Sequence, residues 1–384
     1  MSAENPKEFP KGPPAYHRVV VKAGTAVLTG GTGHLDPEVM GSLINQIAHL
    51  RRDNLEVLLV TSGAIAAGRH ALGQPRERRE VPFRQVLAAV GQSRLMHTYQ
   101  EIFAQHNLVV AQALLTRADI SNRQGYLSVR DSLLTLLEMG VVPVINENDV
   151  VTMEEIGADN FGDNDMLSAL VSNLVDADLL VMLTDIPGLY TADPILHPEA
   201  QLISRVDSVD QSVSNFAKEE ELHAWSQGGM TTKLEAARLA TSWGVAVVIA
   251  GGREQDVLIK VVSGKEQGTF FAPSTSKMES RRRWLLSGLS TRGEIQVDDG
   301  AATALRSQHR SLLPAGVQKV RGDFSRHDVV LIVDGEGRNV ACGVANYSSG
   351  EVCAVKGLHS DQIQETLGHL YGAEVVHRNN LVVL

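Results

Sequence analysis

The chain has 384 residues, of which 43% are hydrophobic and 21% are charged. This length predicts two domains rather than one, and the hydrophobic fraction is sufficient for a sizeable core. The formal net charge of −10 argues against general affinity for nucleic acids, and the chain has no apolar run as long as the roughly 18 residues of a membrane helix.

The N-terminus and the cysteines bear on the cellular location. The first 17 residues contain several prolines and lack the charged-then-apolar pattern of a signal peptide. We therefore expect residues 1–17 to form a disordered leader. Cys342 and Cys353 lack metal-ligand spacing, and a single pair is too few for a disulfide framework. A reduced cytoplasm is the expected location.

Strands and helices are expected to alternate after the leader. Asp36 followed by Pro37 is typical of a helix start, with a capping side chain and a proline in the first turn. Gly140 is a typical helix end. The elements expected in this part, in chain order, are a strand at 19–21, a helix from 36, a strand at 57–60, a helical region over 83–103, a short strand at 108–111 and a helix over 121–139.

The stretch from 141 to 193 is expected to organise the fold. Two buried strands, at 141–145 and 179–183, each end in polar residues: 146–149 after the first, and Thr184 with Asp185 after the second. Between them, Asp163-Asn164-Asp165 begins a helix. A later glycine-rich turn begins a helix that ends at Gly244, and a strand follows at 245–250. The alternation predicts an α/β fold with a mostly parallel sheet, whose strand ends and helix starts share one crevice.

The composition changes near residue 277. Residues 277 to 328 hold ten Lys and Arg against six Asp and Glu, so this segment carries a net charge of 10 − 6 = +4. Short alternating runs with many glycines follow, and they predict β-hairpins, with Asp334-Gly335 as a turn. We expect a domain boundary at about 277–288.

Two glycine turns beside lysines predict a phosphate-binding crevice. Lys22 ends the first strand just before Gly24, and Lys233 lies in the first turn of a helix just after Gly228 and Gly229. Glycines let backbone N–H groups approach an anion, and a lysine supplies the positive charge that phosphoryl oxygens need. Each lysine alone has a simpler interpretation, because a lysine at a strand end is usually just solvated. P-loop, dinucleotide-binding and protein-kinase signatures are absent from the sequence.

The polar residues after the central strands also have simpler interpretations. Asp163 or Asn164 would cap a helix, and residues 146–149 would form an ordinary turn. The cluster nevertheless holds more polar groups than capping requires. A carboxylate between two lysines would orient them, amides and hydroxyls would bind a zwitterion, and Thr184-Asp185 would contact a nucleotide. None of the thirteen histidines stands in a convincing position for a base, which fits an already ionised nucleophile.

Several motifs together resemble the glutamate 5-kinases of the amino-acid kinase family. They are VVVKAGTAVLTGG, LLVTSGAIAAGR, AAVGQS, LLTRADI, VPVINENDVV, GDNDMLSA, LLTDIPGLYTADP and GGMTTKLEAA, and the tail, with GEIQVDDGAATAL and VACGVANYSS, resembles a PUA domain. The resemblance implies a three-layer α/β sandwich with a mostly parallel central sheet, and a small β-rich C-terminal domain. The implied domains are the leader (1–17), a catalytic domain (18–276), a basic linker (277–287) and a PUA-like domain (288–384).

The resemblance also implies an activity, ATP-dependent phosphorylation of the L-glutamate γ-carboxylate, the first step of proline biosynthesis. By motif position, Lys22, Lys233 and Asp165 would be catalytic. Ser62, Asp149 and Asn164 would bind glutamate. The positions that would bind ATP are Lys22, Thr184, Asp185, Gln227, Gly228, Gly229, Met230, Thr231, Thr232 and Lys233. Mg²⁺ would come with ATP, without side-chain ligands from the protein.

Further implications of the resemblance are feedback inhibition by L-proline, a homo-oligomer and an RNA contact through the PUA-like domain. Proline shares the α-carboxylate and α-nitrogen of glutamate, so we expect overlapping sites, with Asp149 near the ammonium and Asn164 or Ser62 near the carboxylate. Two alternatives stay open. One is a kinase for N-acetylglutamate, aspartate, carbamate or a nucleotide. The other is a non-catalytic RNA-binding protein acting through its tail.

Overall fold

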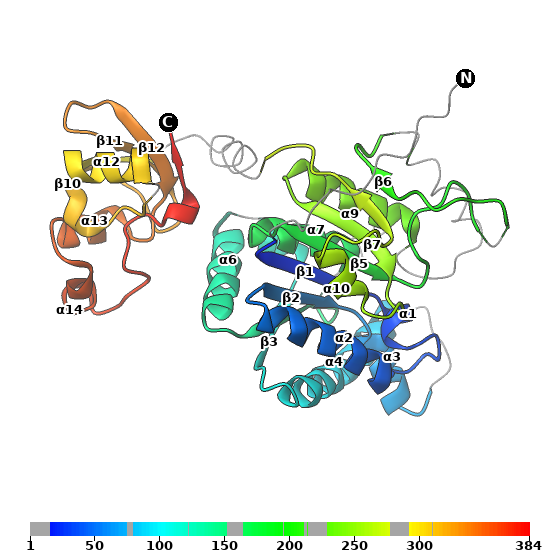
Figure 1. Cartoon of the computed structure of the whole chain (residues 1–384). Helices are drawn as coiled ribbons and strands as arrows, with labels where there is room; N and C mark the ends of the chain where they lie inside the picture. The colour runs from blue at the N-terminus through cyan, green and yellow to red at the C-terminus, as the bar shows by residue number, and fades with distance from the viewer. Residues whose placement is uncertain are drawn as a thin grey trace, which may run out of the picture. The chain divides into compact units, whose positions relative to one another are not determined.

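The computed structural model describes residues 16–74, 80–121, 123–151, 164–194, 196–210, 213, 229–276, 292–308 and 310–384. The expected basic linker, and the expected leader up to residue 15, lie outside these ranges. The chain divides into two compact units, Met1–Lys277 and Met278–Leu384 (Figure 1). In the described parts of both units, no helix is long and apolar enough to cross a membrane.

The first unit is built on a mostly parallel sheet, as predicted. Its described strands number eight, and they lie in the order β3-β4-β2-β1-β5-β7-β8-β6. All pairs are parallel except β7 with β8, which is antiparallel. The strands are β1 (Arg18–Ala23), β2 (Glu56–Thr61), β3 (Val110–Leu115), β4 (Val142–Glu147), β5 (Leu179–Thr184), β6 (Arg205–Val206), β7 (Ala246–Gly251) and β8 (Thr269–Phe271).

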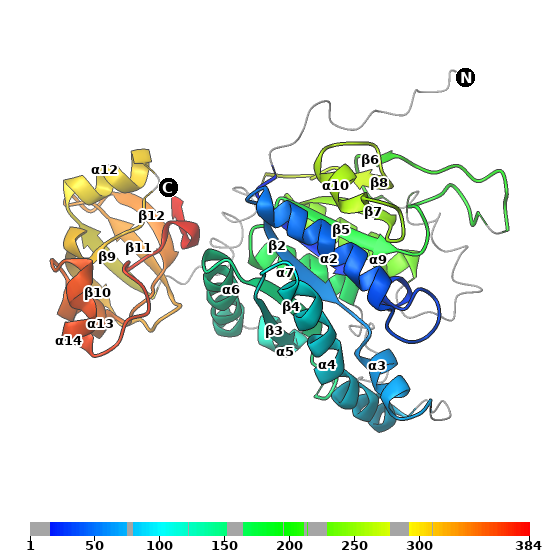
Figure 2. The same ribbon diagram turned by 60° about the horizontal axis from the view of Figure 1, so that its bottom comes forward.

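Helices cover both faces of this sheet, which gives the predicted three layers (Figures 1 and 2). The apolar residues of one face pack against α1 (Thr25–Leu28), α2 (Pro37–Arg52), α4 (Val81–Ala104) and α10 (Val257–Val262). Those of the other face pack against α5 (Arg117–Ser121), α6 (Arg123–Glu138), α7 (Asn164–Leu174) and α9 (Met230–Ser242). A further helix, α3 (Ala64–Ala71), follows β2. Each central strand is therefore buried on both sides, which explains its continuous apolar sequence.

Most of the predicted helix starts and ends lie where the sequence indicates them. The Asp36 carboxylate caps α2 by accepting from the N–H groups of Glu38 and Val39, and Gly140 and Gly244 adopt positive φ angles after α6 and α9. The helix expected over 121–139 is α6, at 123–138, and a separate short helix, α5, precedes it. One boundary was wrong: the strand expected at 108–111 lies at 110–115 instead. The register of that strand is set by its pairing with β4, which the local sequence does not encode.

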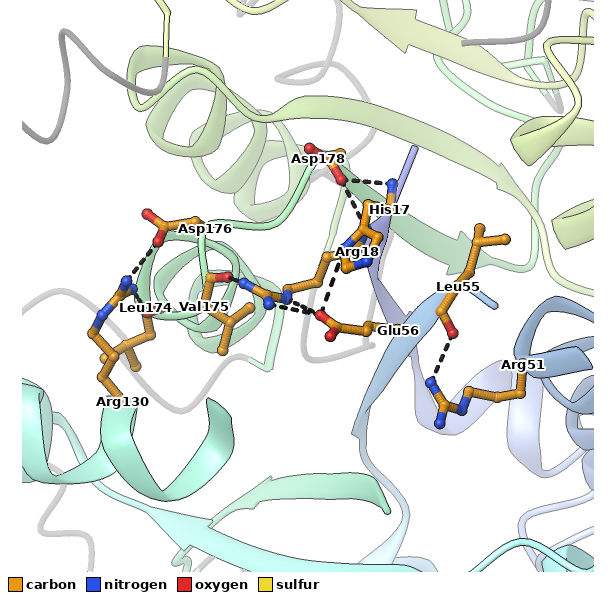
Figure 3. Close-up of polar contacts among 10 residues, drawn as sticks. All are labelled: His17, Arg18, Arg51, Leu55, Glu56, Arg130, Leu174, Val175, Asp176 and Asp178. Atoms are coloured by element: carbon orange, nitrogen blue, oxygen red, sulfur yellow. Dashed lines mark hydrogen bonds and ion pairs between the residues drawn. The ribbon is translucent and has the colours of Figure 1, made fainter. Parts of the chain in front are cut away.

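A network of ion pairs and hydrogen bonds fixes the amino ends of β1 and β5 and the carboxyl end of α7 (Figure 3). Arg18 of β1 donates to the carbonyl of Val175 and contacts Glu56 at 2.6 Å, and Arg130 of α6 donates to the carbonyl of Leu174. These arginines satisfy carbonyl groups that the end of a helix leaves without intrahelical partners. The network therefore holds α7 against β1, and both elements carry site residues at their opposite ends.

The second unit is a separate five-stranded sheet in the order β10-β9-β11-β12-β13 among its described residues. Its strands are β9 (Gly293–Val297), β10 (Val317–Gly322), β11 (Val329–Val333), β12 (Asn339–Val344) and β13 (Leu381–Val383). Its helices are α12 (Asp299–Gln308), α13 (Ser349–Val355) and α14 (Ile363–Leu367). The β-rich character was predicted, and the Asp334-Gly335 turn does join β11 to β12. The prediction of hairpins throughout was wrong, because α12 separates β9 from β10 and β9 pairs in parallel with β11.

Candidate active site

The strand ends and helix starts of the first unit converge at the middle of the sheet. From β1 the chain continues to β2 on one side of β1, and β5 lies on its other side. In open α/β sheets, ligands bind outside the carboxyl ends of the strands where the connections diverge in this way. Lys22 comes from that end of β1, and Ser62 follows β2. Asn164 and Asp165 come from the start of α7.

The strand periodicity explains why Lys22 meets α7. Val20 belongs to the core on the face that α7 and α9 cover, whereas Val19 and Val21 belong to the opposite core. Lys22 is two residues after Val20, so its side chain leaves the strand on that same face. Two segments 143 residues apart in sequence are thereby brought together at the end of the sheet.

Asp165 lies between the two predicted lysines. Its Oδ1 is 2.5 Å from the Nζ of Lys22, and its Oδ2 is 3.1 Å from the Nζ of Lys233. The hydroxyl of Thr232 also donates to Oδ2, at 3.1 Å. Asp165 is fully buried, while Lys22 is 4% exposed and Lys233 is 6% exposed. The structure thus joins three residues predicted separately from three sequence segments.

The charges of this cluster do not balance. Burial by itself raises the pKa of Asp165, but the ammonium groups of Lys22 and Lys233 outweigh that effect and hold the pKa below its usual value. Asp165 is therefore ionised, and one carboxylate beside two ammonium groups leaves a net charge of +1. Two buried ammonium groups held together by one carboxylate offer positive charge to the oxygens of an anionic ligand.

Glycines leave room for such a ligand beside both lysines. A Cβ on Gly24 would lie 3.4 Å from the Nζ of Lys22, and one on Gly229 would meet nothing within 4 Å. Gly229 is the N-cap residue of α9, and it offers no side chain to satisfy the first N–H groups of that helix. A helix start of this kind, with free N–H groups and the positive end of the dipole, binds phosphate. Gln227 and Gly228 lie outside the described residues.

A set of amides and a hydroxyl lies beside this cluster. The side-chain N–H₂ of Asn164 donates to Ser62 Oγ at 3.0 Å and to Asn146 Oδ1 at 3.2 Å. The Asn146 amide in turn donates to Gln92 Oε1 at 2.9 Å. Ser62 and Asn164 were predicted as neighbours in one site, and the structure brings them into contact. Asn146 and Gln92 were not among the predicted site residues, although both lie in motifs that carry the resemblance.

For the remaining predicted residues that the structure describes, the position in the fold is as follows. Asp149 lies in the turn after β4 and is half-buried. The hydroxyl of Thr184, at the end of β5, donates to Asp185 at 3.0 Å, and Asp185 is exposed. The Met230 side chain belongs to the hydrophobic core, so only its backbone is available to a nucleotide. The hydroxyl of Thr231 has no hydrogen-bond partner among the described residues.

Comparison with known proteins places the chain in a family. The model of the amino acid kinase family matches residues 17–251, and that of the PUA domain matches residues 293–367. A glutamate 5-kinase of Dehalococcoides mccartyi strain CBDB1 is 53% identical over 96% of this chain and 99% of its own length. The chain belongs to the amino acid kinase family and, within it, to the glutamate 5-kinases.

Other relatives with the same name come from different bacteria. The glutamate 5-kinase of Herpetosiphon aurantiacus is 50% identical over 96% of this chain and 98% of its own length. That of Shewanella halifaxensis is 47% identical over the same shares of the two chains. Because these matches span nearly whole proteins, the second unit is part of the similarity as well as the first.

Proposed function

We propose that the chain transfers the γ-phosphoryl group of ATP to the γ-carboxylate of L-glutamate. The product is L-glutamyl 5-phosphate, and the reaction is the first step of proline biosynthesis. The observation that carries the proposal is the buried cluster of Lys22, Asp165 and Lys233, which has an excess positive charge and adjoins a set of amides in a member of the glutamate 5-kinases.

In the proposed reaction the protein forms no covalent bond with either substrate. The γ-carboxylate of glutamate is ionised at neutral pH, so the nucleophile needs no general base. An oxygen of this carboxylate attacks the γ-phosphorus, the bond from that phosphorus to the bridging oxygen breaks, and its electron pair leaves with ADP. Catalysis then depends on positioning and on stabilising the charge of the phosphoryl oxygens. Lys22 and Lys233 supply the positive charge, and Asp165 keeps their two ammonium groups together.

Mg²⁺ is proposed to enter as part of the ATP complex, where it neutralises phosphate charge. Among the described residues, His, Cys, Asp and Glu do not form a group of three or more able to hold a metal ion. The residues that are present, two lysines and the glycine-preceded start of α9, instead suit the phosphate oxygens. We propose that the two lysines and the start of α9 contact the phosphate oxygens, and that Mg²⁺ binds together with ATP as part of the substrate.

The test is turnover of the full-length chain with Mg-ATP and a panel of acids: L-glutamate, N-acetylglutamate, L-aspartate and carbamate. Hydroxylamine traps an acyl phosphate as a hydroxamate, which is measured by its colour with ferric ion. We expect hydroxamate with L-glutamate. Product with N-acetylglutamate or L-aspartate alone would overturn the proposed substrate. A folded protein without product from any acid would favour a non-catalytic role.

L-Proline is proposed as a feedback inhibitor that overlaps the glutamate site. Proline carries the same α-carboxylate and a charged α-nitrogen, so the polar groups that hold one ligand also suit the other. Asp149, two residues after β4, is proposed to face the ammonium group. The proposed location is the reduced cytoplasm, because a single pair of cysteines is too few for a disulfide framework.

A further inference from the structure

Three amides form a continuous chain of hydrogen bonds across the end of the sheet. Gln92 belongs to α4, on one face of the sheet, and Asn164 begins α7, on the other face. Asn146 lies between them at the end of β4, where it bonds to both, and it is 2% exposed. The proposed reaction gives Gln92 no task, and its contact with Asn146 bridges 54 residues of sequence.

A backbone group determines which way each amide faces. The N–H of Glu147 donates to the Oδ1 of Asn146 at 2.9 Å, and a backbone N–H can only donate. The amide of Asn146 therefore cannot be reversed without losing this bond. Its N–H₂ group faces Gln92, which must present its oxygen, and its oxygen faces Asn164, which must present its N–H₂ group. The orientation of all three amides follows from one unambiguous donor.

This orientation leaves a specific atom of Asn164 available. Its N–H₂ group is committed to Ser62 and Asn146, so the atom left over is Oδ1, a hydrogen-bond acceptor. Within the described parts of the chain, Oδ1 has no hydrogen-bond partner, although it is buried. A buried acceptor without a partner is unfavourable, and a ligand N–H group would satisfy it. The α-ammonium of an amino acid is such a donor, whereas an α-carboxylate is not.

We propose that Gln92 is a positioning residue: through Asn146, its side-chain oxygen holds Asn164 with Oδ1 turned to the α-ammonium of the amino-acid substrate. This inference rests on the proposed function. It assigns the Asn164 side chain to the ammonium rather than to the carboxylate expected from sequence. It also gives α4 a reason to present a glutamine there, because an apolar residue would remove the acceptor of the Asn146 N–H₂ group and leave that amide oriented by one hydrogen bond fewer.

The first test replaces Gln92 by methionine, which has a similar length but no acceptor. In Gln92→Met the KM for glutamate should rise about five- to tenfold, because one orienting hydrogen bond is lost, while kcat stays within about twofold. Gln92→Glu keeps an oxygen that accepts from Asn146, so its KM should stay within about threefold of the wild-type value. If Gln92→Met does not fold, Gln92→Glu decides by itself. A KM for glutamate raised tenfold or more in Gln92→Glu would overturn the proposal.

The pair of variants also separates positioning from direct contact. If the Gln92 amide instead donated to a substrate carboxylate, Gln92→Glu would bind glutamate worse than Gln92→Met does, because two carboxylates would repel each other. A second readout is the inhibition constant of glutarate, which has both carboxylates of glutamate but no ammonium. We expect this constant to change less than about twofold in Gln92→Met. A rise parallel to that of the glutamate KM would show that Asn164 Oδ1 does not serve the ammonium.

The matched control is Gln100→Met, which makes the same replacement at an exposed position of α4. It should leave the glutamate KM and the thermal midpoint unchanged. An unaltered KM in Gln92→Met, with only a lower thermal midpoint, would reduce Gln92 to a structural residue and overturn the proposal. These outcomes are distinct from a failure of the proposed function, in which the wild-type chain itself would not phosphorylate glutamate.

Discussion

Lys233 is buried in the first turn of α9, where a positive charge opposes the helix dipole. Its contact with Asp165 at 3.1 Å offsets that cost and aims the ammonium group at the end of the sheet. If Lys233 stabilises the charge of the transferred group, Lys233→Ala should lower kcat by about 10²–10³, with a smaller change in the two KM values. Steady-state kinetics with ATP and glutamate measure this. Lys265→Ala, at an exposed position, is the control, and a wild-type kcat in Lys233→Ala would remove this lysine from the mechanism.

The contribution of Asp165 to the free energy of unfolding should depend on pH. Asp165→Asn removes the carboxylate that contacts both buried ammonium groups, which should lower the free energy of unfolding by about 3–5 kcal/mol at neutral pH. The folded-state pKa of Asp165 is below its ordinary value of 3.8, so its contribution is fully present above that value and is lost as the pH falls through the folded-state pKa. Urea unfolding at pH 7 and at about pH 3 should therefore show the gap between wild type and variant narrowing in acid. A gap that is equal at both pH values would mean that Asp165 is not held ionised by the lysines.

Asp149 tests the proposed overlap of glutamate and proline. Asp149→Ala removes the negative charge proposed to face the ligand ammonium, so it should raise the KM for glutamate and weaken proline inhibition together, each by about tenfold or more. ATP binding should change little. If Asp149 were only a turn residue, Asp149→Ala would instead lower the thermal midpoint and leave the kinetics of the folded protein unchanged. Glutamate binding that weakens while proline inhibition persists would show that the two ligands do not share Asp149.

Two glycines hold α3 and α4 at backbone contact, next to the residues of the amide chain. A Cβ on Gly91 would lie 1.8 Å from the carbonyl oxygen of Ala64, and one on Gly68 would lie 1.9 Å from that of Leu87. These neighbours are backbone atoms, so an added methyl group would force the helices apart. Gly91 precedes Gln92, and α3 begins two residues after Ser62. The helix crossing therefore sets the position of Gln92 as well as the packing.

Gly91→Ala should lower the free energy of unfolding by about 3 kcal/mol, at the upper end of the cost of overpacking. In the control variant, the free energy of unfolding should change in the opposite direction. Gly41 lies inside α2, and a Cβ there would meet nothing within 4 Å, so Gly41→Ala should stabilise the protein by about 1 kcal/mol through helix propensity. Urea denaturation of both variants measures the difference. Equal effects of the two substitutions would show that the α3–α4 contact tolerates separation.

The elements that sequence predicts best are those with their own local signals. The continuous apolar runs of β1, β2, β5 and β7 and the Asp36 cap are such signals, and the structure confirms them. The helix α12 was missed, because the Asp-Asp-Gly at its start is typical of a turn and the strand β9 ends just before it. The strand order was not predictable, since it depends on pairings such as β1 with β5, about 160 residues apart.

The site was predictable to the extent that its residues follow strand ends and glycine turns. Lys22, Lys233 and Asp165 each carry such a signal, and only the fold shows that they meet. Gln92 carries none, because it lies in the middle of a long helix with the pattern of any surface polar residue. Its partner Asn146 also has an ordinary local explanation, a turn after a strand. Their contact exists because β4 turns Asn146 toward the face that α4 covers, which is a property of the whole sheet.

Each unit of the whole molecule has a hydrophobic core of its own. Two apolar clusters of the first unit fill the layers on either side of its sheet, and they include residues from β1 to β8. A third cluster lies within the second unit and extends from Ile295 to Leu381. Independent cores are the physical basis of independent folding. The buried site residues Lys22, Asp165 and Lys233, the amide chain and the start of α9 all belong to the first unit.

A truncated chain that ends at Ser276 should therefore fold and retain phosphoryl transfer, with kcat within about threefold of the full-length value. The cut leaves both described cores of the first unit intact, including β8, which ends at Phe271. The measurement is hydroxamate formation from glutamate and Mg-ATP, together with a thermal melt of the truncated and full-length chains. The isolated C-terminal segment from residue 288 supplies the converse control, because it should fold without any kinase activity. A soluble, cooperatively folded but inactive truncated chain would contradict the prediction, and it would mean that the second unit acts on the site rather than serving a separate role such as RNA binding.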